Sequence, residues 1–367
     1  MSAAAWWGAL RERMASSPSA PWSRAQGERR MQSPTGVAAE FDVTLLWVIF
    51  ALVALGLLMV YSSSIASASE SRFTRFSASY YLIRQLVFVV IGAVLALFVF
   101  ETSMRNWQRA APYVFAFAIV LLVLVLLPGI GRVVNGARRW IALGPFGLQP
   151  SELMKFAIVL FAARYAVTKA AVLHAAQPLK QSLIHGLGPF LLWALLISVL
   201  LLKEPDFGAT LVVLSTGLLV LFMAGLDARL VLPVLAVGLI AAVALVWIEP
   251  YRLERVFGFL DPWKEEFGKG YQLTQSLIAI GRGGLWGLGI GAGVSKHYYL
   301  PEAHTDFILA VTAEELGLLG LCLVIAAFAW LTWRSFMIGR EARRLEQPFS
   351  ALVAQGIGTL FGIQSLI

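Results

Sequence analysis

The chain has 367 residues, of which 59% are hydrophobic and only 14% charged, and its formal net charge is +8. Soluble domains have roughly 45–50% apolar and about 25% charged residues, so this composition excludes a single water-soluble core and indicates membrane helices. The basic residues lie between apolar runs instead of in one patch, which favours anionic lipid or a phosphate-bearing substrate over nucleic acid. Cys322 is the only cysteine, so disulfides and cysteine-based metal sites are excluded.

The first 42 residues carry five arginines among Ser, Pro and Ala, and they lack the apolar core of a cleavable signal peptide. We expect residues 1–42 to form a disordered cytoplasmic tail. With this tail inside, the inner loops contain more Arg and Lys than the short outer loops, as the positive-inside rule requires. A long polar loop at 249–305 then lies outside the membrane.

Nine apolar segments follow the tail, and most are long enough for a helix to cross a bilayer. They show no alternation of polar and apolar positions, so they predict helices and not strands. The segments are 43–64, 80–100, 112–128, 151–166, 186–202, 207–226, 230–248, 306–333 and 349–367. We therefore predict an all-α polytopic membrane domain at 43–367. Its last segment reaches Ile367 without a polar stop, which indicates a chain that is cut within a membrane helix.

Two polar stretches flank the start of the fourth segment. Arg138 and Arg139 precede Trp140, which places two guanidiniums beside an aromatic ring at the outer interface, although Trp140 also fits a simple interfacial anchor. Glu152 and Lys155 lie one helical turn apart. Either the two residues form an ion pair that neutralises both charges, or Glu152 positions Lys155 to bind phosphate.

The 249–305 loop is rich in glycine and aromatic residues, and a loop of this length is seldom a mere connector. Its glycines allow close backbone approach and could cradle an anion, although glycine equally serves helix packing. After His304 and Thr305, Asp306 opens the segment 306–333. A carboxylate near lipid is costly, so Asp306 is a candidate general base; the alternative is a helix cap made by Thr305 or Asp306.

Structural roles are expected for the other acidic residues. Glu204 and Asp206 lie in an outer turn and are expected to pair locally. Glu314 and Glu315 lie about two helical turns beyond Asp306, and we expect them to pair with a basic residue on a neighbouring helix. The chain has no His/Cys ligand spacing, P-loop, GxSxG or Rossmann motif, which removes the common hydrolase and nucleotide chemistries.

Five linked motifs resemble the SEDS family of peptidoglycan glycosyltransferases, and the resemblance runs from about residue 43 to the end. The motifs are Ala137-Arg138-Arg139-Trp140, Gln149-Pro150-Ser151-Glu152 with Lys155, Glu204-Pro205-Asp206-Phe207-Gly208, Gly270-Tyr271-Gln272, and Leu300-Pro301-Glu302-Ala303-His304-Thr305-Asp306-Phe307. Glu204-Pro205-Asp206-Phe207, Asp261-Pro262-Trp263, Ala303 and the long N-terminal tail are more similar to the cell-division type of the family than to the elongation type.

The resemblance implies ten membrane helices with both termini cytoplasmic, and polymerisation of lipid II into glycan strands at the outer face of the bacterial inner membrane. It also implies work at the division septum with a class B penicillin-binding protein and other division proteins. The acidic residue of the family's His-Thr-Asp-Phe motif is Asp306 here. The chain departs from the family pattern by ending inside the expected ninth helix.

Such a polymerase needs a base for the acceptor hydroxyl and positive charge for the departing pyrophosphate. Asp306 is the predicted base, acting on the GlcNAc 4-hydroxyl. The candidates for pyrophosphate are Arg139, Lys155, Arg252, Arg255 and Arg282, with a divalent cation such as Mg²⁺ or Mn²⁺ and no organic cofactor. Further substrate contacts are predicted for Glu152, Trp140, Tyr271, Gln272 and His304. A lipid II transporter or flippase, the elongation-type polymerase and a division scaffold remain alternatives.

Overall fold

The computed structural model describes residues 42–70, 77–134, 136–144, 146–173, 178–248, 258–259, 261–265, 268, 270–297 and 299–367. By its contacts the chain divides into two units, Met1–Asp42 and Val43–Ile367. The tail predicted at 1–42 lies outside the described residues except for Asp42. The description below concerns the second unit.

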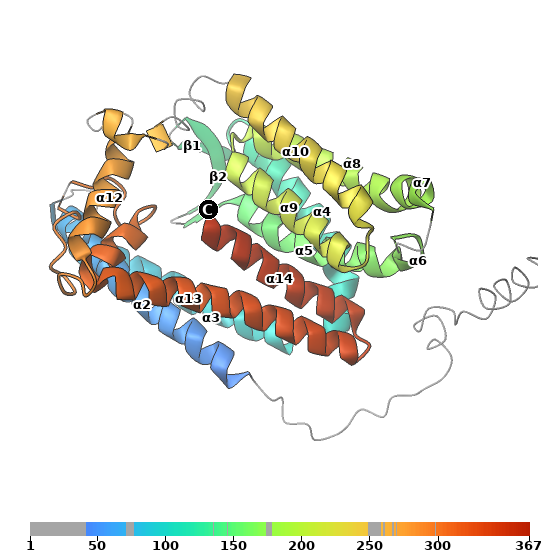
Figure 1. The fold of residues 1–367 in the computed structure, drawn as a ribbon, viewed down its shortest axis with the longest axis horizontal. Helices are drawn as coiled ribbons and strands as arrows, with labels where there is room; N and C mark the ends of the chain where they lie inside the picture. Colours follow the sequence, from blue (N-terminus) through green and yellow to red (C-terminus); the bar gives the residue numbers. More distant parts are fainter. Residues whose placement is uncertain are drawn as a thin grey trace, which may run out of the picture. The chain divides into compact units, whose positions relative to one another are not determined.

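Nine long helices among the described residues coincide with the nine predicted apolar segments (Figure 1). They are α2 (Val43–Glu70), α3 (Tyr80–Glu101), α4 (Met104–Leu126), α5 (Pro150–Thr168), α8 (Gly188–Lys203), α9 (Phe207–Met223), α10 (Ala228–Ile248), α13 (Ile308–Arg344) and α14 (Pro348–Leu366). Seven helical stretches of the described chain are long and apolar enough to cross a membrane, and α5 and the shorter α9 complete the nine. The predicted polytopic helical membrane protein is confirmed.

Several helices continue beyond their apolar segments. The segment predicted to end at residue 333 forms a helix to Arg344, because the last turns are basic and lie beyond the apolar stretch that marks the lipid. Short helices α6 (Ala170–Leu173) and α7 (Leu179–Gln181) and the π-helical η1 (Ser182–Leu187) precede α8. The long 249–305 loop contains a 3-10 turn, η2 (Pro262–Glu265), and the helix α12 (Tyr271–Gly283).

A small antiparallel sheet lies between α4 and α5 and was not part of the all-α prediction. Its order is β1 (Gly131–Val134), β2 (Ala137–Leu143) and β3 (Phe146–Leu148). Gly131 pairs with Ile141, and Ala142 pairs with Gly147. Strands this short carry a weak sequence signal, and positive φ angles at Gly136 and Gly144 permit the tight turns between them.

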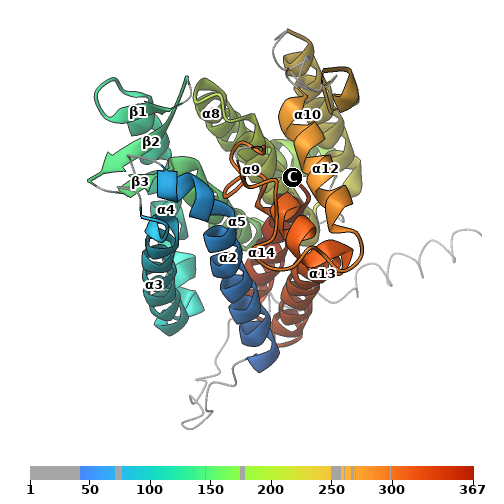
Figure 2. The same cartoon turned by 90° about the vertical axis from the view of Figure 1, so that its left-hand side faces the viewer.

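Two side-chain hydrogen bonds show which elements lie at each end of α9. At one end, Arg343 Nη2 donates to the carbonyl oxygen of Met223 at 2.9 Å, which joins the end of α13 to the end of α9. At the opposite end, Arg139 Nε on β2 donates to the carbonyl oxygen of Glu204 at 3.0 Å, between α8 and α9. Figures 1 and 2 show the sheet and α12 toward this second end, which the charge pattern predicts to be the outer one.

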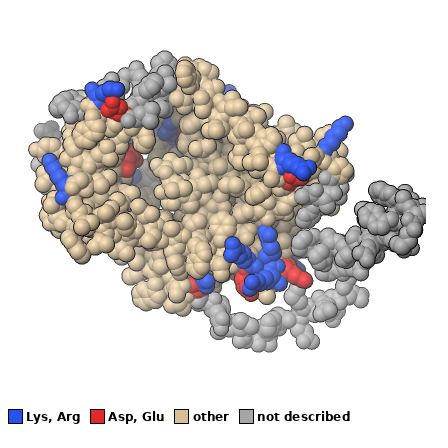
Figure 3. Space-filling view, viewed as in Figure 1, with Lys and Arg blue, Asp and Glu red and all other residues tan. Residues whose placement is uncertain are grey.

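Most of the face in Figure 3 is uncharged, and most of its Lys, Arg, Asp and Glu side chains gather in a few clusters toward the margins. Large apolar side chains are exposed on the helices, including Leu97 at 65% and Trp247 at 70%. In water this surface would be unstable, whereas lipid tails solvate it. The exposure therefore agrees with helices that face a bilayer.

Two apolar clusters hold the helices together. The larger buries side chains of α4, α5, α8, α9 and α14, and it includes a stacked pair of Phe115 and Phe161 rings with centroids 3.9 Å apart. The smaller contains Met59 of α2, Ala279 of α12, Leu300 and Ala303 of the loop, and Val311 of α13. This second cluster fixes the end of the long loop on the helices that flank Asp306.

Candidate functional site

Asp306 lies in a turn immediately before α13, and its side chain is exposed. It does not cap the helix, because the N-cap position is Phe307 without a side-chain cap bond. Thr305 Oγ1 instead donates to the Glu302 carboxylate at 2.9 Å, so neither form of the predicted cap is present. Buried Leu300 and Ala303 anchor the turn, and the Phe307 amide donates to the Glu302 carbonyl at 3.3 Å. The Asp306 carboxylate is thus exposed to solvent, while buried residues of the same turn hold its backbone in place.

His304 connects this turn to α3. Its ring lies 4.4 Å from the ring of Tyr81, centroid to centroid. Burial lowers the pKa of His304, although the nearby Glu302 carboxylate acts against this effect. His304 is therefore neutral at pH 7 and can act as a hydrogen-bond donor or acceptor without adding charge.

A cavity of about 260 Å³ lies between the start of α3 and the sheet. Its polar wall contains Arg84 and Arg132, both exposed, and Trp140 is also part of the lining. Arg84 follows Tyr81 by three residues, so it lies one helical turn from the partner of His304. Two guanidiniums and an aromatic ring suit a phosphate-bearing ligand.

Sequence reasoning missed Arg84 and Arg132 and found only Trp140 in this cavity. Arg84 is the one charged residue within the apolar segment 80–100. A charge inside a membrane segment marks a functional candidate by default, so the signal was available. Arg132 belongs to a strand, and only the pairing of β1 with β2 brings it opposite Trp140.

Two of the five basic residues predicted to bind pyrophosphate are engaged elsewhere. Arg139 Nε donates to the Glu204 carbonyl at 3.0 Å and Nη2 donates to the Pro205 carbonyl, so its guanidinium holds the α8–α9 turn. Lys155 is 6% exposed and pairs with Glu152 at 2.7 Å, which is the ion pair predicted as one alternative. Neither residue lines the arginine-rich cavity.

The remaining predicted residues lie on α12 or outside the described chain. Arg282 is exposed in the last turn of α12, whereas Tyr271 and Gln272 form its first turn. Arg252 and Arg255 lie outside the described residues. No group of three or more His, Cys, Asp or Glu within the described ranges is arranged to hold a metal ion. The divalent cation stays a prediction.

The carboxylates of Glu204 and Asp206, in the α8–α9 turn, do not have the local partners that were predicted. Asp206 caps α9 by accepting from the Ala209 amide at 3.1 Å, and it also accepts from Gln149 Nε2 at 3.1 Å and Ser151 Oγ at 3.2 Å. Glu204 is fully buried, and neither carboxyl oxygen has a hydrogen-bond partner among the described residues. The pairing prediction was wrong for Glu204, because Arg139 bonds to its carbonyl and not to its carboxylate.

Burial raises the pKa of Glu204 to about 8, with a further contribution from Asp206, while Arg139 acts in the opposite direction. The folded protein then binds one more proton than the unfolded chain between pH 4.5 and about 8. The contribution of Glu204 to the free energy of unfolding is therefore most favourable below pH 4.5. Between pH 4.5 and about 8 the free energy of unfolding falls by roughly 1.4 kcal/mol per pH unit.

Replacing Glu204 by Gln is therefore expected to remove this part of the pH dependence. Wild-type protein should unfold at a lower temperature at pH 8.5 than at pH 6, and Glu204→Gln should lose little over the same interval. Thermal unfolding in detergent measures both. Glu341→Gln, which alters an exposed carboxylate, is the matched control. An equal pH dependence in Glu204→Gln and wild type would show that Glu204 is ionised in the fold.

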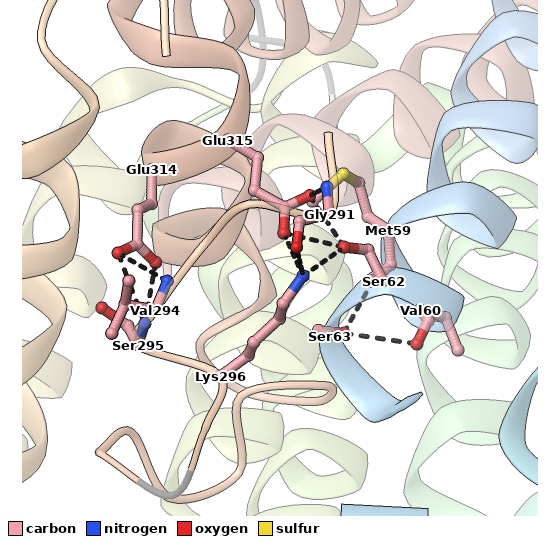
Figure 4. A network of polar contacts seen from close by, with 10 residues as sticks. All are labelled: Met59, Val60, Ser62, Ser63, Gly291, Val294, Ser295, Lys296, Glu314 and Glu315. Carbon is pink, nitrogen blue, oxygen red and sulfur yellow. Dashed lines mark hydrogen bonds and ion pairs between the residues drawn. The ribbon is translucent and has the colours of Figure 1, made fainter. Parts of the chain in front are cut away.

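A buried polar network joins α2, the long loop and α13 (Figure 4). Lys296 Nζ pairs with Glu315 Oε1 of α13 at 2.7 Å, and it donates to Ser62 Oγ of α2 at 3.0 Å. Glu314 accepts from the backbone amides of Val294 and Ser295 at 3.1 Å each. The predicted basic partner thus exists for Glu315, but it comes from the long loop and not from a neighbouring helix.

The comparisons with known proteins agree with this architecture. The FtsW/RodA/SpoVE family, described as a family of cell cycle proteins, matches residues 43–367. The chain belongs to this family. Among curated members, it is 49% identical to a probable peptidoglycan glycosyltransferase FtsW of Aromatoleum aromaticum, over 92% of this chain and 81% of that protein. It is 46% identical to the same kind of protein in Burkholderia thailandensis, over 89% of this chain and 70% of that protein.

Two solved structures are similar in fold to this member of the FtsW/RodA/SpoVE family. One belongs to a peptidoglycan synthase complex that coordinates polymerization and crosslinking, with a TM-score of 0.67, 28% identity, and coverage of 90% of this chain and 86% of that one. The other is the rod shape determining protein RodA of Thermus thermophilus, with a TM-score of 0.61, 27% identity, and coverage of 90% and 84%. The fold of the family is therefore present in this chain.

Proposed function

We propose that this family member is a peptidoglycan glycosyltransferase of the FtsW type, which polymerises lipid II into glycan strands during septal cell-wall synthesis. The observation that carries the proposal is the contact between the Asp306 turn and the start of α3. Asp306 is exposed, His304 of the same turn contacts Tyr81, and Arg84 of the arginine-lined cavity lies one helical turn beyond Tyr81. The names of the curated relatives support the same reaction.

In this reaction Asp306 accepts the proton of the acceptor GlcNAc 4-hydroxyl as its oxygen attacks the anomeric carbon of the donor. The bond from that carbon to the diphosphate breaks, and undecaprenyl diphosphate leaves. An α-linked donor gives a β-linked product by one inverting displacement, so no covalent nucleophile is needed. Arg84 and Arg132 stabilise the charge that develops on the leaving diphosphate.

The proposed location is the bacterial inner membrane at the division septum, and the proposed partner is a class B penicillin-binding protein. Structural likeness to a chain of a peptidoglycan synthase complex supports such a partner. Other division proteins and the surrounding membrane lipid are further proposed partners. A divalent cation, Mg²⁺ or Mn²⁺, would assist the departure of the diphosphate by neutralising its charge.

Incubation of the purified protein with lipid II, with and without the penicillin-binding protein, tests the function. We expect glycan strands, and more of them with the partner. A parallel assay in vesicles follows movement of labelled lipid II between leaflets. Movement without polymerisation would favour the flippase alternative. If neither activity occurs and Asp306→Ala still complements cells depleted of the protein, a scaffold role replaces the enzyme.

The cavity arginines give a separate prediction. Arg84→Gln and Arg132→Gln should each lower kcat/KM for lipid II by about 10- to 100-fold, because each removes a charge-assisted hydrogen bond to phosphate. Steady-state kinetics of the two variants measure this loss. Arg105→Gln is the control, since Arg105 is exposed near a cavity at the opposite end of the helices. Equal kinetics in all three variants would remove the cavity from the active site.

A further inference from the structure

The ammonium group of Lys296 is fully used inside the protein. Its three acceptors are Glu315 Oε1 at 2.7 Å, the Gly291 carbonyl oxygen at 2.7 Å and Ser62 Oγ at 3.0 Å. The side chains of Lys296 and Glu315 are 2% and 0% exposed. An ammonium group has three protons, so none is left for a substrate phosphate. Lys296 is therefore not one of the cations that bind diphosphate.

The Glu315 carboxylate is equally engaged. Besides Lys296, it accepts from Ser62 Oγ at 2.7 Å and from the Gly291 amide at 3.0 Å. Ser62 lies on α2, 253 residues away in sequence. One network thus joins α2, the long loop and α13, as Figure 4 shows.

Backbone hydrogen bonds dock the same part of the loop on α13. The amides of Leu288 and Gly289 donate to the carbonyls of Glu314 and Glu315, both at 3.0 Å. Gly317 has a non-helical conformation inside α13, and beyond it the Leu318 amide donates to the Gly284 carbonyl at 2.9 Å. The helix gives up some of its own hydrogen bonds to hold the loop, which makes the loop position part of the α13 structure.

A buried ion pair is a costly way to gain stability, because apolar residues of similar volume often stabilise as well or better. A pair bound to three elements instead specifies one arrangement of those elements. Lys296 precedes Asp306 by ten residues, and Leu300 and Ala303 between them are buried against α2, α12 and α13. The position of Asp306 therefore depends on where Lys296 is held.

We propose that Ser62, Lys296 and Glu315 are positioning residues that set the place of the Asp306 carboxylate relative to α2 and α13. This proposal rests on the proposed function of Asp306. Loosening the network leaves substrate binding at the arginine-lined cavity intact and moves the base. The expected defect is consequently in kcat, with KM unchanged.

Ser62 offers the sharpest test, because its neighbour is a matched control. Ser63 is also buried, but its hydroxyl bonds within α2, to the Met59 carbonyl at 2.7 Å. Ser62→Ala should lower kcat for lipid II polymerisation at least about 10-fold, since a misplacement of about 1 Å can cost 100-fold. Ser62→Thr, which keeps the hydroxyl, should recover most of it. Ser63→Ala should match wild type.

A paired substitution separates positioning from stability. Lys296→Met leaves a buried carboxylate without its cation and should lower the unfolding temperature, whereas Lys296→Met with Glu315→Leu should restore it. We expect kcat of the double variant to stay low although it is folded. A double variant with wild-type kcat would show that the network serves stability alone.

Hydrogen exchange gives a measurement that does not depend on catalysis. Backbone amides of residues 288–307 should exchange faster in Ser62→Ala than in Ser63→Ala, at a pH and temperature where both are folded. Equal exchange overturns the positioning proposal even if the protein polymerises lipid II. Faster exchange in a protein that never polymerises would instead keep the network and reject the proposed function.

Discussion

Replacing Asp306 by Asn is expected to lower the rate of lipid II polymerisation by about 10²- to 10⁴-fold, the usual contribution of a general base. Asn has nearly the same shape but cannot accept the proton of the acceptor hydroxyl. Because Asp306 is exposed and caps no helix, the unfolding temperature should hardly change. The product is measured as glycan strands from purified lipid II, and folding is measured by thermal unfolding in the same detergent.

Glu302→Gln is the matched control for Asp306→Asn. Glu302 is also an exposed carboxylate in the same turn, and its side chain accepts from Thr305 Oγ1, which Gln can continue to do. Its polymerisation rate should stay within a few-fold of wild type. If Asp306→Asn retains full activity, or if Glu302→Gln is equally inactive, Asp306 is not the specific base.

The second large effect is expected at Gly287. This glycine has φ of +82°, and an added Cβ would lie 2.2 Å from the carbonyl oxygen of Glu315. That oxygen belongs to the backbone of α13 and cannot rotate away, so Gly287→Ala must separate the loop from the helix. We expect the unfolding temperature to fall markedly, with a loss of several kcal/mol, and polymerisation to be lost with it.

Gly281 is the control for this prediction, and Gly317 is a second position where a Cβ should be destabilising. Gly281 lies in α12, with ordinary φ and open space around its Cβ position, so Gly281→Ala should be neutral or stabilising by up to about 1 kcal/mol. Gly317→Ala should resemble Gly287→Ala, because its φ is +71° and its Cβ would lie 2.4 Å from the Gly287 amide nitrogen. Thermal unfolding of the three variants provides the comparison. A stable, active Gly287→Ala would mean that the loop does not dock on α13.

The membrane helices were predictable because the information for them is local. A run of apolar residues long enough to cross a bilayer can bury its backbone polar groups only as a helix, whatever the rest of the chain does. The apolar segments 43–64 and 80–100 therefore became α2 and α3. The sheet at 131–148 was not predicted, because short strands depend on pairing partners that a local pattern does not reveal.

Within the site, the sequence indicated Asp306, His304 and Trp140 through their residue types and their order along the chain. It could not show that Arg139 bonds to carbonyl groups of the α8–α9 turn, which occupies donors that were expected to bind diphosphate. Nor could it place Arg84 and Arg132 around one cavity, since they belong to a helix and a strand that meet only in the fold.

The sequence by itself determined that the protein is built of membrane helices, because apolar length and the cost of unpaired backbone groups are properties of each segment alone. It also determined a carboxylate that directly precedes one of these helices. Only the tertiary structure decided which charges are free and which are engaged. Lys296 meets Ser62 and Glu315 through contacts between α2, the loop and α13, and such contacts between distant residues depend on packing that no local pattern encodes.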